Sequence, residues 1–180
     1  MTPADILDFW FSEPSRRRWF KSTSGFDREL AERFEELHVM AADGVLADWE
    51  QSPDGALALV ILLDQIPLNI YRGEPRCFAT EGLALAVAGR AIARGLDREL
   101  APERLAFLYM PYMHSESLTD QERSVELYTQ PGLEHHLKWA RHHRDIVRRF
   151  GRFPHRNAIL GRESTLEERR YLGSPKAFKG

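Results

Sequence analysis

The sequence has little of what covalent or metal cross-links require. Cys77 is its only cysteine, so no internal disulfide can form, and no CxxC pair is present to hold zinc. Such a chain is typical of a reducing compartment, and we expect a cytoplasmic protein.

Membrane and export signals are also scarce. The longest wholly apolar run, ALALVILL, covers residues 56–63, far short of the roughly 20 residues that a membrane helix needs. The N-terminal MTPADILDFWF carries acidic residues where a secretory signal is basic, and it ends in bulky aromatics where cleavage needs small residues. We therefore expect a soluble chain that is neither exported nor membrane-bound.

The chain is rich in core-forming side chains. Of its 180 residues 43% are hydrophobic, with 10 Phe, 5 Tyr and 4 Trp, enough to fill the core of one domain spanning residues 1–180. Its charge is unevenly spread: residues 131–180 hold 12 Lys and Arg against 5 Asp and Glu, whereas residues 1–130 hold 13 against 22. The basic third either attracts anions or is neutralised by the rest of the domain.

Apolar residues recur every three or four positions and almost never alternate, which predicts an all-α fold of about nine short helices. Antiparallel hairpins in a TPR-like bundle are the expected arrangement. The helix that follows Ser52 and Pro53 is apolar nearly all round and should be the central one. The other helices are expected from Pro3, and at residues 26–42, 80–95, 102–117, 120–129, 133–150 and 164–172.

Cap signals set several of these helix ends. Thr119 with Glu122, and Ser164 with Glu167, have the spacing of capping boxes. Gly151 should end the helix that begins near residue 133.

Four long motifs carry a resemblance to a known family. They are ILDFWF, LLDQIPLNIYRG, LYMPYMHSESLTDQERSVELY and RHHRDIVRRFGRFPHRNAILGRES, and together they extend over almost the whole chain. The sequence resembles the bacterial domain-of-unknown-function family nine-two-four, whose members are all-helical and assigned to the TPR-like superfamily. The resemblance implies a fold and no settled activity.

The motif LLDQIPLNIYRG is the first candidate site. Pro67 should end its helix, which places Asp64 and Gln65 in the last turn and Arg72 on the loop beyond. A carboxylate at a helix C-terminus is unfavourable, because the helix dipole is negative there, unless a nearby cation compensates the charge. Asp64 is therefore either tied by a salt bridge to Arg72 or a C-terminal arginine, or part of a pocket wall.

GRFPHRN, residues 151–157, is the second candidate. Its glycine, proline and flanking apolar residues should make the loop rigid and hold Arg152, His155, Arg156 and Asn157 in place. Two guanidiniums, an amide and an imidazole that titrates near neutrality suit the binding of a carboxylate or phosphate. The alternative is that Arg156 and Asn157 cap neighbouring helix ends.

The histidines divide into two groups. His114 follows Pro111, whose kink either aims the imidazole into a cavity or bends the helix round the core. The pairs at 135–136 and 142–143 repeat at seven residues, too far along a helix for two ligands of one ion. His136 and His143 are more typical of core or pocket-rim histidines satisfied by hydrogen bonds. We expect no metal and no cofactor.

No established catalytic signature decides whether the protein is an enzyme, because the chain has no glycine-rich phosphate loop and no GxSxG elbow. One hypothesis is an anion-accepting small-molecule pocket, open to catalysis, in which His155 or His114 transfers the proton. The side chains expected to converge there are Asp64, Arg72, His114, His155 and Arg156.

The second hypothesis is a TPR-like module whose groove takes a protein or peptide partner. An open groove with exposed Trp10, Phe11 and Trp19 would favour it. Nucleic acid is a weaker alternative because the chain is slightly acidic overall. The basic face that suggests it consists of Lys138, Arg141, Arg148 and Arg152.

Overall fold

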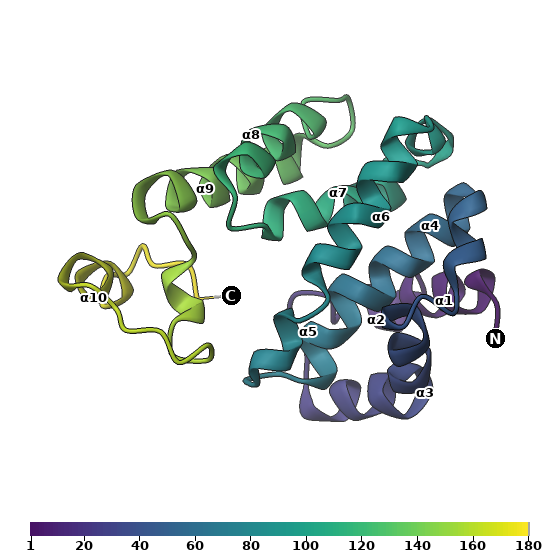
Figure 1. Ribbon diagram of the computed structural model, residues 1–180, viewed down its shortest axis with the longest axis horizontal. Coiled ribbons are helices and arrows are strands. Elements are labelled where there is room, and N and C mark those ends of the chain that lie inside the picture. The colour runs from purple at the N-terminus through teal and green to yellow at the C-terminus, as the bar shows by residue number, and fades with distance from the viewer. Residues whose placement is uncertain (180) are drawn as a thin grey trace.

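The computed structural model describes residues 1–179, so Gly180, the last residue of the predicted domain, lies outside the described part. No strand occurs among residues 1–179, and the all-α class is confirmed (Figure 1). The elements in chain order are α1 Pro3–Trp10, α2 Glu13–Arg16, α3 Ser24–Ala42, η1 Ala47–Gln51, α4 Pro53–Val60, η2 Ile61–Gln65, α5 Ile66–Ile70, η3 Pro75–Phe78, α6 Glu81–Ala93, η4 Leu96–Glu99, α7 Pro102–His114, α8 Leu118–Leu127, α9 Glu134–Phe150, η5 Pro154–Arg156 and α10 Leu166–Leu172.

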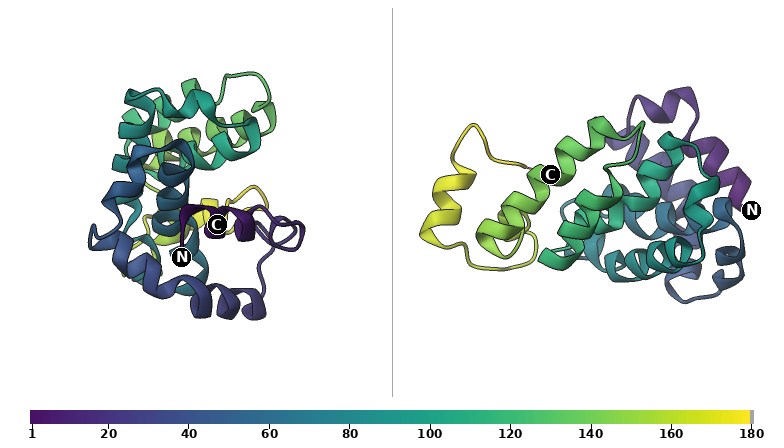
Figure 2. Two further views of the ribbon diagram at one scale, coloured as in Figure 1. Left: turned by 90° about the vertical axis from the view of Figure 1, so that its right-hand side faces the viewer. Right: turned by 90° about the horizontal axis from the view of Figure 1, so that it is seen from above.

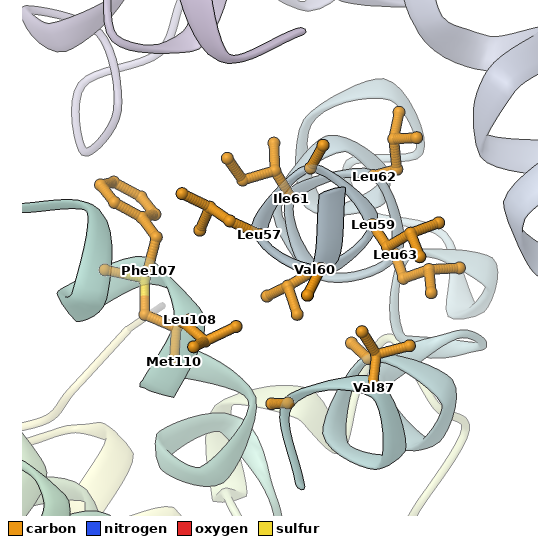
Figure 3. Packing of buried hydrophobic residues seen from close by; sticks show 14 of the residues in the cluster. Leu57, Leu59, Val60, Ile61, Leu62, Leu63, Val87, Phe107, Leu108 and Met110 are labelled. Atoms are coloured by element: carbon orange, nitrogen blue, oxygen red, sulfur yellow. The ribbon is translucent and has the colours of Figure 1, made fainter. Parts of the chain in front are cut away.

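The helix from Pro53 to Ile70 is the centre of the fold, as the sequence predicts. It begins where the Ser52 side chain accepts the Gly55 N–H, with Pro53 in the first turn. By length and composition this helix could cross a membrane, but 78% of it is buried inside the protein, as in a core helix. Its α4 part packs against α1, α6 and α7. Figure 3 shows its side chains pointing outward on several sides, towards Val87 and Phe107 among others.

Pro67 does not end this helix, contrary to the sequence-based prediction. The chain widens into a π-helical segment, η2, where the Ile66 N–H binds the Ile61 carbonyl, and α5 follows with Pro67 in its first turn. A proline has no N–H to offer the preceding turn, and two side chains from elsewhere supply donors there. Thr80 Oγ1 donates to the Leu63 carbonyl over 2.5 Å, and His38 Nδ1 lies 2.8 Å from the Leu62 carbonyl.

Several other helix ends differ from the prediction by one to three residues. α7 ends at His114 rather than at 117. Ser117, not Thr119, caps α8, because Ser117 has the extended backbone that lets its hydroxyl accept the Asp120 N–H. The last capping box is Thr165 with Glu168, one residue beyond the predicted pair. Gly151 ends α9 in the left-handed region at φ 69°, as expected.

Buried apolar side chains form two clusters of very different size. The large one surrounds the central helix and includes Trp10, 1% exposed. The small one consists of Ile146, Val147 and Phe153, with the partly buried rings of Phe150, Tyr171 and Phe178 packed against them. In Figures 1 and 2, α10 lies at one end of the molecule and α1 at the other. The TPR-like relationship and the single-domain assignment stay predictions.

Candidate functional site

Asp64 and His114 form a buried hydrogen-bonded pair where the central helix meets the end of α7. The Asp64 side chain is fully buried, and its Oδ1 lies 2.8 Å from His114 Nδ1. Gln65 Nε2 donates to the other carboxylate oxygen over 2.5 Å. An ionised carboxylate only accepts, so His114 donates from Nδ1 and its Nε2 is left for exchange with a ligand or solvent. The His114 side chain is 18% exposed.

The π-helical segment explains how Asp64 comes to lie inside the protein. Because the helix continues past Pro67, Asp64 lies in its middle rather than in a last turn, and its charge is not answered by Arg72. Arg72 instead binds Asp27 over 3.0 Å and Asn69 over 2.9 Å, at an exposed position. The predicted salt bridge from Asp64 to Arg72 is wrong.

Glu81 and Arg156 form the second half of the cluster. The two terminal guanidinium nitrogens of Arg156, Nη1 and Nη2, donate to Glu81 over 2.8 and 2.9 Å, and Nη2 also donates to the His114 carbonyl over 3.1 Å. The guanidinium carbon lies 4.4 Å from the ring centre of Phe78 and 4.8 Å from that of Phe153. Arg156 therefore has the structural role foreseen for it, since it caps α7 and pairs with a carboxylate, although that carboxylate is Glu81 and not Asp64.

The charges of the cluster explain how its members titrate. Burial opposes a charge on the imidazole, but the Asp64 carboxylate, aided by Glu81, outweighs it and raises the pKa of His114. Burial likewise raises the pKa of Glu81, and Arg156 only partly offsets this effect. With His114 neutral, two carboxylates face one guanidinium, so protonation of His114 makes the cluster electrically neutral.

A divalent ion would find possible ligands here, contrary to the reasoning from sequence spacing. One ligand atom each from Asp64, Glu81 and His114 lies within 4.8 Å of the others. These residues are far apart in the sequence, so helical spacing does not reveal them. The bidentate contact of Arg156 with Glu81 competes with a metal, because it already neutralises one of the three ligands.

His155 is close to the cluster in sequence but has a different environment. Its ring centre lies 5.6 Å from that of Phe153 and 5.0 Å from that of Phe178. Burial, together with the nearby charge of Arg156, lowers the pKa of His155 to about 4. The prediction of an imidazole that titrates near neutrality is wrong for His155, and of the two candidates for proton transfer only His114 has the required partner.

Two of the remaining predicted residues also serve the structure of the loop. Arg152 binds Glu168 over 2.7 Å, and Asn157 donates to Ser164 and accepts from Arg162, each over 3.0 Å. No helix starts at Asn157, so its predicted N-cap role is wrong.

Sequence reasoning missed the pair that fixes this loop. Arg162 binds both oxygens of Glu116 over 2.7 and 2.9 Å, and Glu116 also accepts the Phe153 N–H over 2.7 Å. Burial favours the neutral carboxyl, but the Arg162 contacts and this N–H outweigh it and lower the pKa of Glu116. The predicted rigidity of the loop therefore has a structural basis, although the residues responsible carry no local sequence signal.

The histidines of α9 are mostly structural. His143 is buried, with Nδ1 2.9 Å from the Trp139 carbonyl, and burial lowers its pKa to about 3. His136 stacks on Tyr128, but its Nδ1 has no hydrogen-bond partner among residues 1–179. The prediction of hydrogen-bonded histidines is thus confirmed for His143 and wrong for His136.

The aromatic residues that would mark an open groove are packed together instead. Trp10 is buried against Phe107, and Trp19 lies 4.5 Å from the same ring, centre to centre. Phe11 makes an edge contact with Trp19 at 5.5 Å. This part of the surface offers no support for the peptide-groove hypothesis.

Comparison with known proteins supports the fold and family of this chain and assigns no chemistry. The family described as "Bacterial protein of unknown function (DUF924)" matches residues 6–176. A solved structure, that of the protein of unknown function ATU0120 from Agrobacterium tumefaciens, is 43% identical with a TM-score of 0.90, over 95% of this chain and 96% of that one. No curated protein matches the sequence.

Proposed function

This chain belongs to the bacterial protein family of unknown function DUF924, and we propose that its Asp64–His114 pair is a proton-transfer site for a small anionic molecule. The observation that carries the proposal is the contact of a fully buried carboxylate with the Nδ1 of a partly exposed imidazole. This contact fixes the tautomer and orientation of the ring, as expected for a general base.

His114 is the residue that would exchange the proton. In its neutral form it takes a proton from the ligand at Nε2, and Asp64 stabilises the imidazolium that results. The raised pKa of His114 favours the imidazolium that forms when it takes the proton, and that imidazolium can return the proton from the same nitrogen.

Arg156 is the residue that would receive the anionic group. Its guanidinium is held between two phenylalanine rings and already binds a carboxylate in the bidentate manner, that of Glu81. Its Nε–H has no acceptor among residues 1–179 although the side chain is only 7% exposed. Glu81 has a raised pKa, so its protonation weakens the internal pair and leaves the guanidinium for the ligand.

The pairing of His114 with Asp64 is tested by measuring the pKa of His114 with nuclear magnetic resonance. We expect a titration of His114 above the ordinary value in the native protein, and a lower pKa in Asp64→Asn, where burial remains and the carboxylate charge is gone. An unchanged pKa in Asp64→Asn would contradict the pairing.

The anion site is tested with succinate and phosphate as probes. Glu81→Gln leaves Arg156 without its internal carboxylate, so succinate should bind about tenfold more tightly, equal to roughly 1.4 kcal/mol. Succinate should also protect the native protein more at mildly acidic than at alkaline pH. Arg72→Gln is the matched control, because Arg72 makes an exposed ion pair outside the cluster. A response that is absent, or equal in both variants, would rule out Arg156 as the receptor.

A further inference from the structure

A groove formed with the C-terminal segment carries an independent inference. It lies between α9 and the last described residues, 176–179, and encloses about 800 Å³. The groove includes no residue of the Asp64–His114 cluster.

The groove gathers positive side chains that make no ion pair within residues 1–179. Arginines elsewhere are mostly bound to carboxylates, including Arg148 with Glu122 and Arg152 with Glu168 on the predicted basic face. Four cationic residues line the groove, and none makes an ion pair among residues 1–179; these are Lys138, Arg141, Lys176 and Lys179.

The groove lining also includes aromatic and aliphatic side chains. Trp139 is 42% exposed, although a ring of this size normally gains by burial. Phe178 and Leu137 also line the groove, and the Phe178 ring packs at 4.5 Å from that of His143, centre to centre. The groove lining thus combines apolar side chains with positive ones.

We propose that this groove docks an acidic peptide segment that places one apolar side chain against Trp139. Charge complementarity supports an acidic occupant, since the described lining holds four cations and two carboxylates, those of Glu134 and Asp145. An exposed Trp ringed by polar groups is the composition of an interaction anchor.

A peptide fits the lining better than a nucleic acid does. Leu137 and Ala177 offer aliphatic contact to a side chain, whereas stacked bases use aromatic platforms in succession. Trp139 is the only strongly exposed aromatic in the lining of the groove, so successive bases would find a single platform for stacking.

The test uses the full chain and a fluorescein-labelled peptide made of glutamates with a central leucine. Fluorescence anisotropy should show binding that weakens as salt is added, because the rim charges are exposed. The tryptophan emission should shift on binding through Trp139. The variant Trp139→Ala should lose this shift and bind the peptide more weakly. The double variant Lys138→Glu/Arg141→Glu should weaken binding by about tenfold or more.

Two controls separate this site from general charge effects. Arg28→Glu reverses the charge of an exposed arginine on α3 that makes no ion pair within the described chain, and it should leave the affinity unchanged. A lysine peptide with the same leucine should not bind. The proposal is overturned if the glutamate peptide does not bind at low salt, if Arg28→Glu weakens it as much as the double variant, or if a single-stranded RNA oligonucleotide binds more tightly.

Discussion

Replacing Arg156 with alanine should destabilise the fold far more than replacing an exposed arginine. The change leaves the Glu81 carboxylate, 16% exposed, without its bidentate partner and the His114 carbonyl without its donor. Removing one member of a buried ion pair costs about 3 to 5 kcal/mol. Glu81 can take up a proton, which limits the loss, so we expect about 3 kcal/mol, or a fall in Tm of roughly 6 to 12 °C for a chain of this length.

The loss should depend on pH in a defined direction. The pKa of Glu81 is already raised by burial, and without Arg156 it rises further, while the unfolded chain keeps the ordinary value. A folded carboxyl with a raised pKa binds its proton more tightly than the unfolded one, so the folded variant gains stability as the pH falls. The deficit of Arg156→Ala should therefore be largest at alkaline pH and shrink on acidification.

Urea denaturation of native protein and variant at several pH values measures both effects. Arg72→Ala, which removes an exposed ion pair, should cost at most about 1 kcal/mol. The double variant Glu81→Leu/Arg156→Leu should recover much of the loss, because no buried charge is left unpaired. A cost for Arg156→Ala no larger than for Arg72→Ala, or a deficit that grows on acidification, would refute this reasoning.

Two further predictions concern the packing of the central helix. Thr80→Val removes the donor to the Leu63 carbonyl and should lower the free energy of unfolding by about 1 to 3 kcal/mol. Thr80→Ser keeps the hydroxyl and should cost much less. Equal losses in the two variants would mean that this hydrogen bond does not stabilise the fold. Gly55→Ala would place a Cβ 2.0 Å from the Trp49 carbonyl oxygen, so it should lower the Tm by several degrees, roughly the effect of 1 to 3 kcal/mol. Gly82→Ala meets no atom within 4 Å and should be neutral or slightly stabilising, which calorimetric melts of the two variants can verify.

The sequence predicted local structure well and long-range partners poorly. Pro53 after Ser52 and Gly151 after α9 act through backbone geometry within one turn, so their effects can be read from neighbouring residues. Pro67 misled the prediction because its missing N–H is compensated from two other helical regions, through His38 and Thr80.

At the candidate site, too, residues with a local sequence signal were predicted and long-range partners were missed. Asp64, Gln65, His114 and Arg156 were identified because each lies in an unusual local pattern. Glu81 was not, since a glutamate in the first turn of a helix is ordinary and its partner is 75 residues away. Arg72, Arg152 and Asn157 have equally suggestive positions in the sequence, and only the fold shows that they bind other residues.

The attachment of the C-terminal segment makes part of the protein sensitive to ionic strength. The apolar cluster of this segment is small. Two arginine–carboxylate pairs join the segment to the rest of the protein: Arg156 binds Glu81 on α6, and Arg162 binds Glu116 in the loop after α7. The Arg162–Glu116 pair is partly exposed and weakens with added salt, whereas the more buried Arg156–Glu81 pair is screened less and the large apolar cluster is not weakened. Amide hydrogens in η5 and α10 should consequently exchange through a partial opening that salt promotes, well below the free energy of global unfolding, and the same opening would uncover His114.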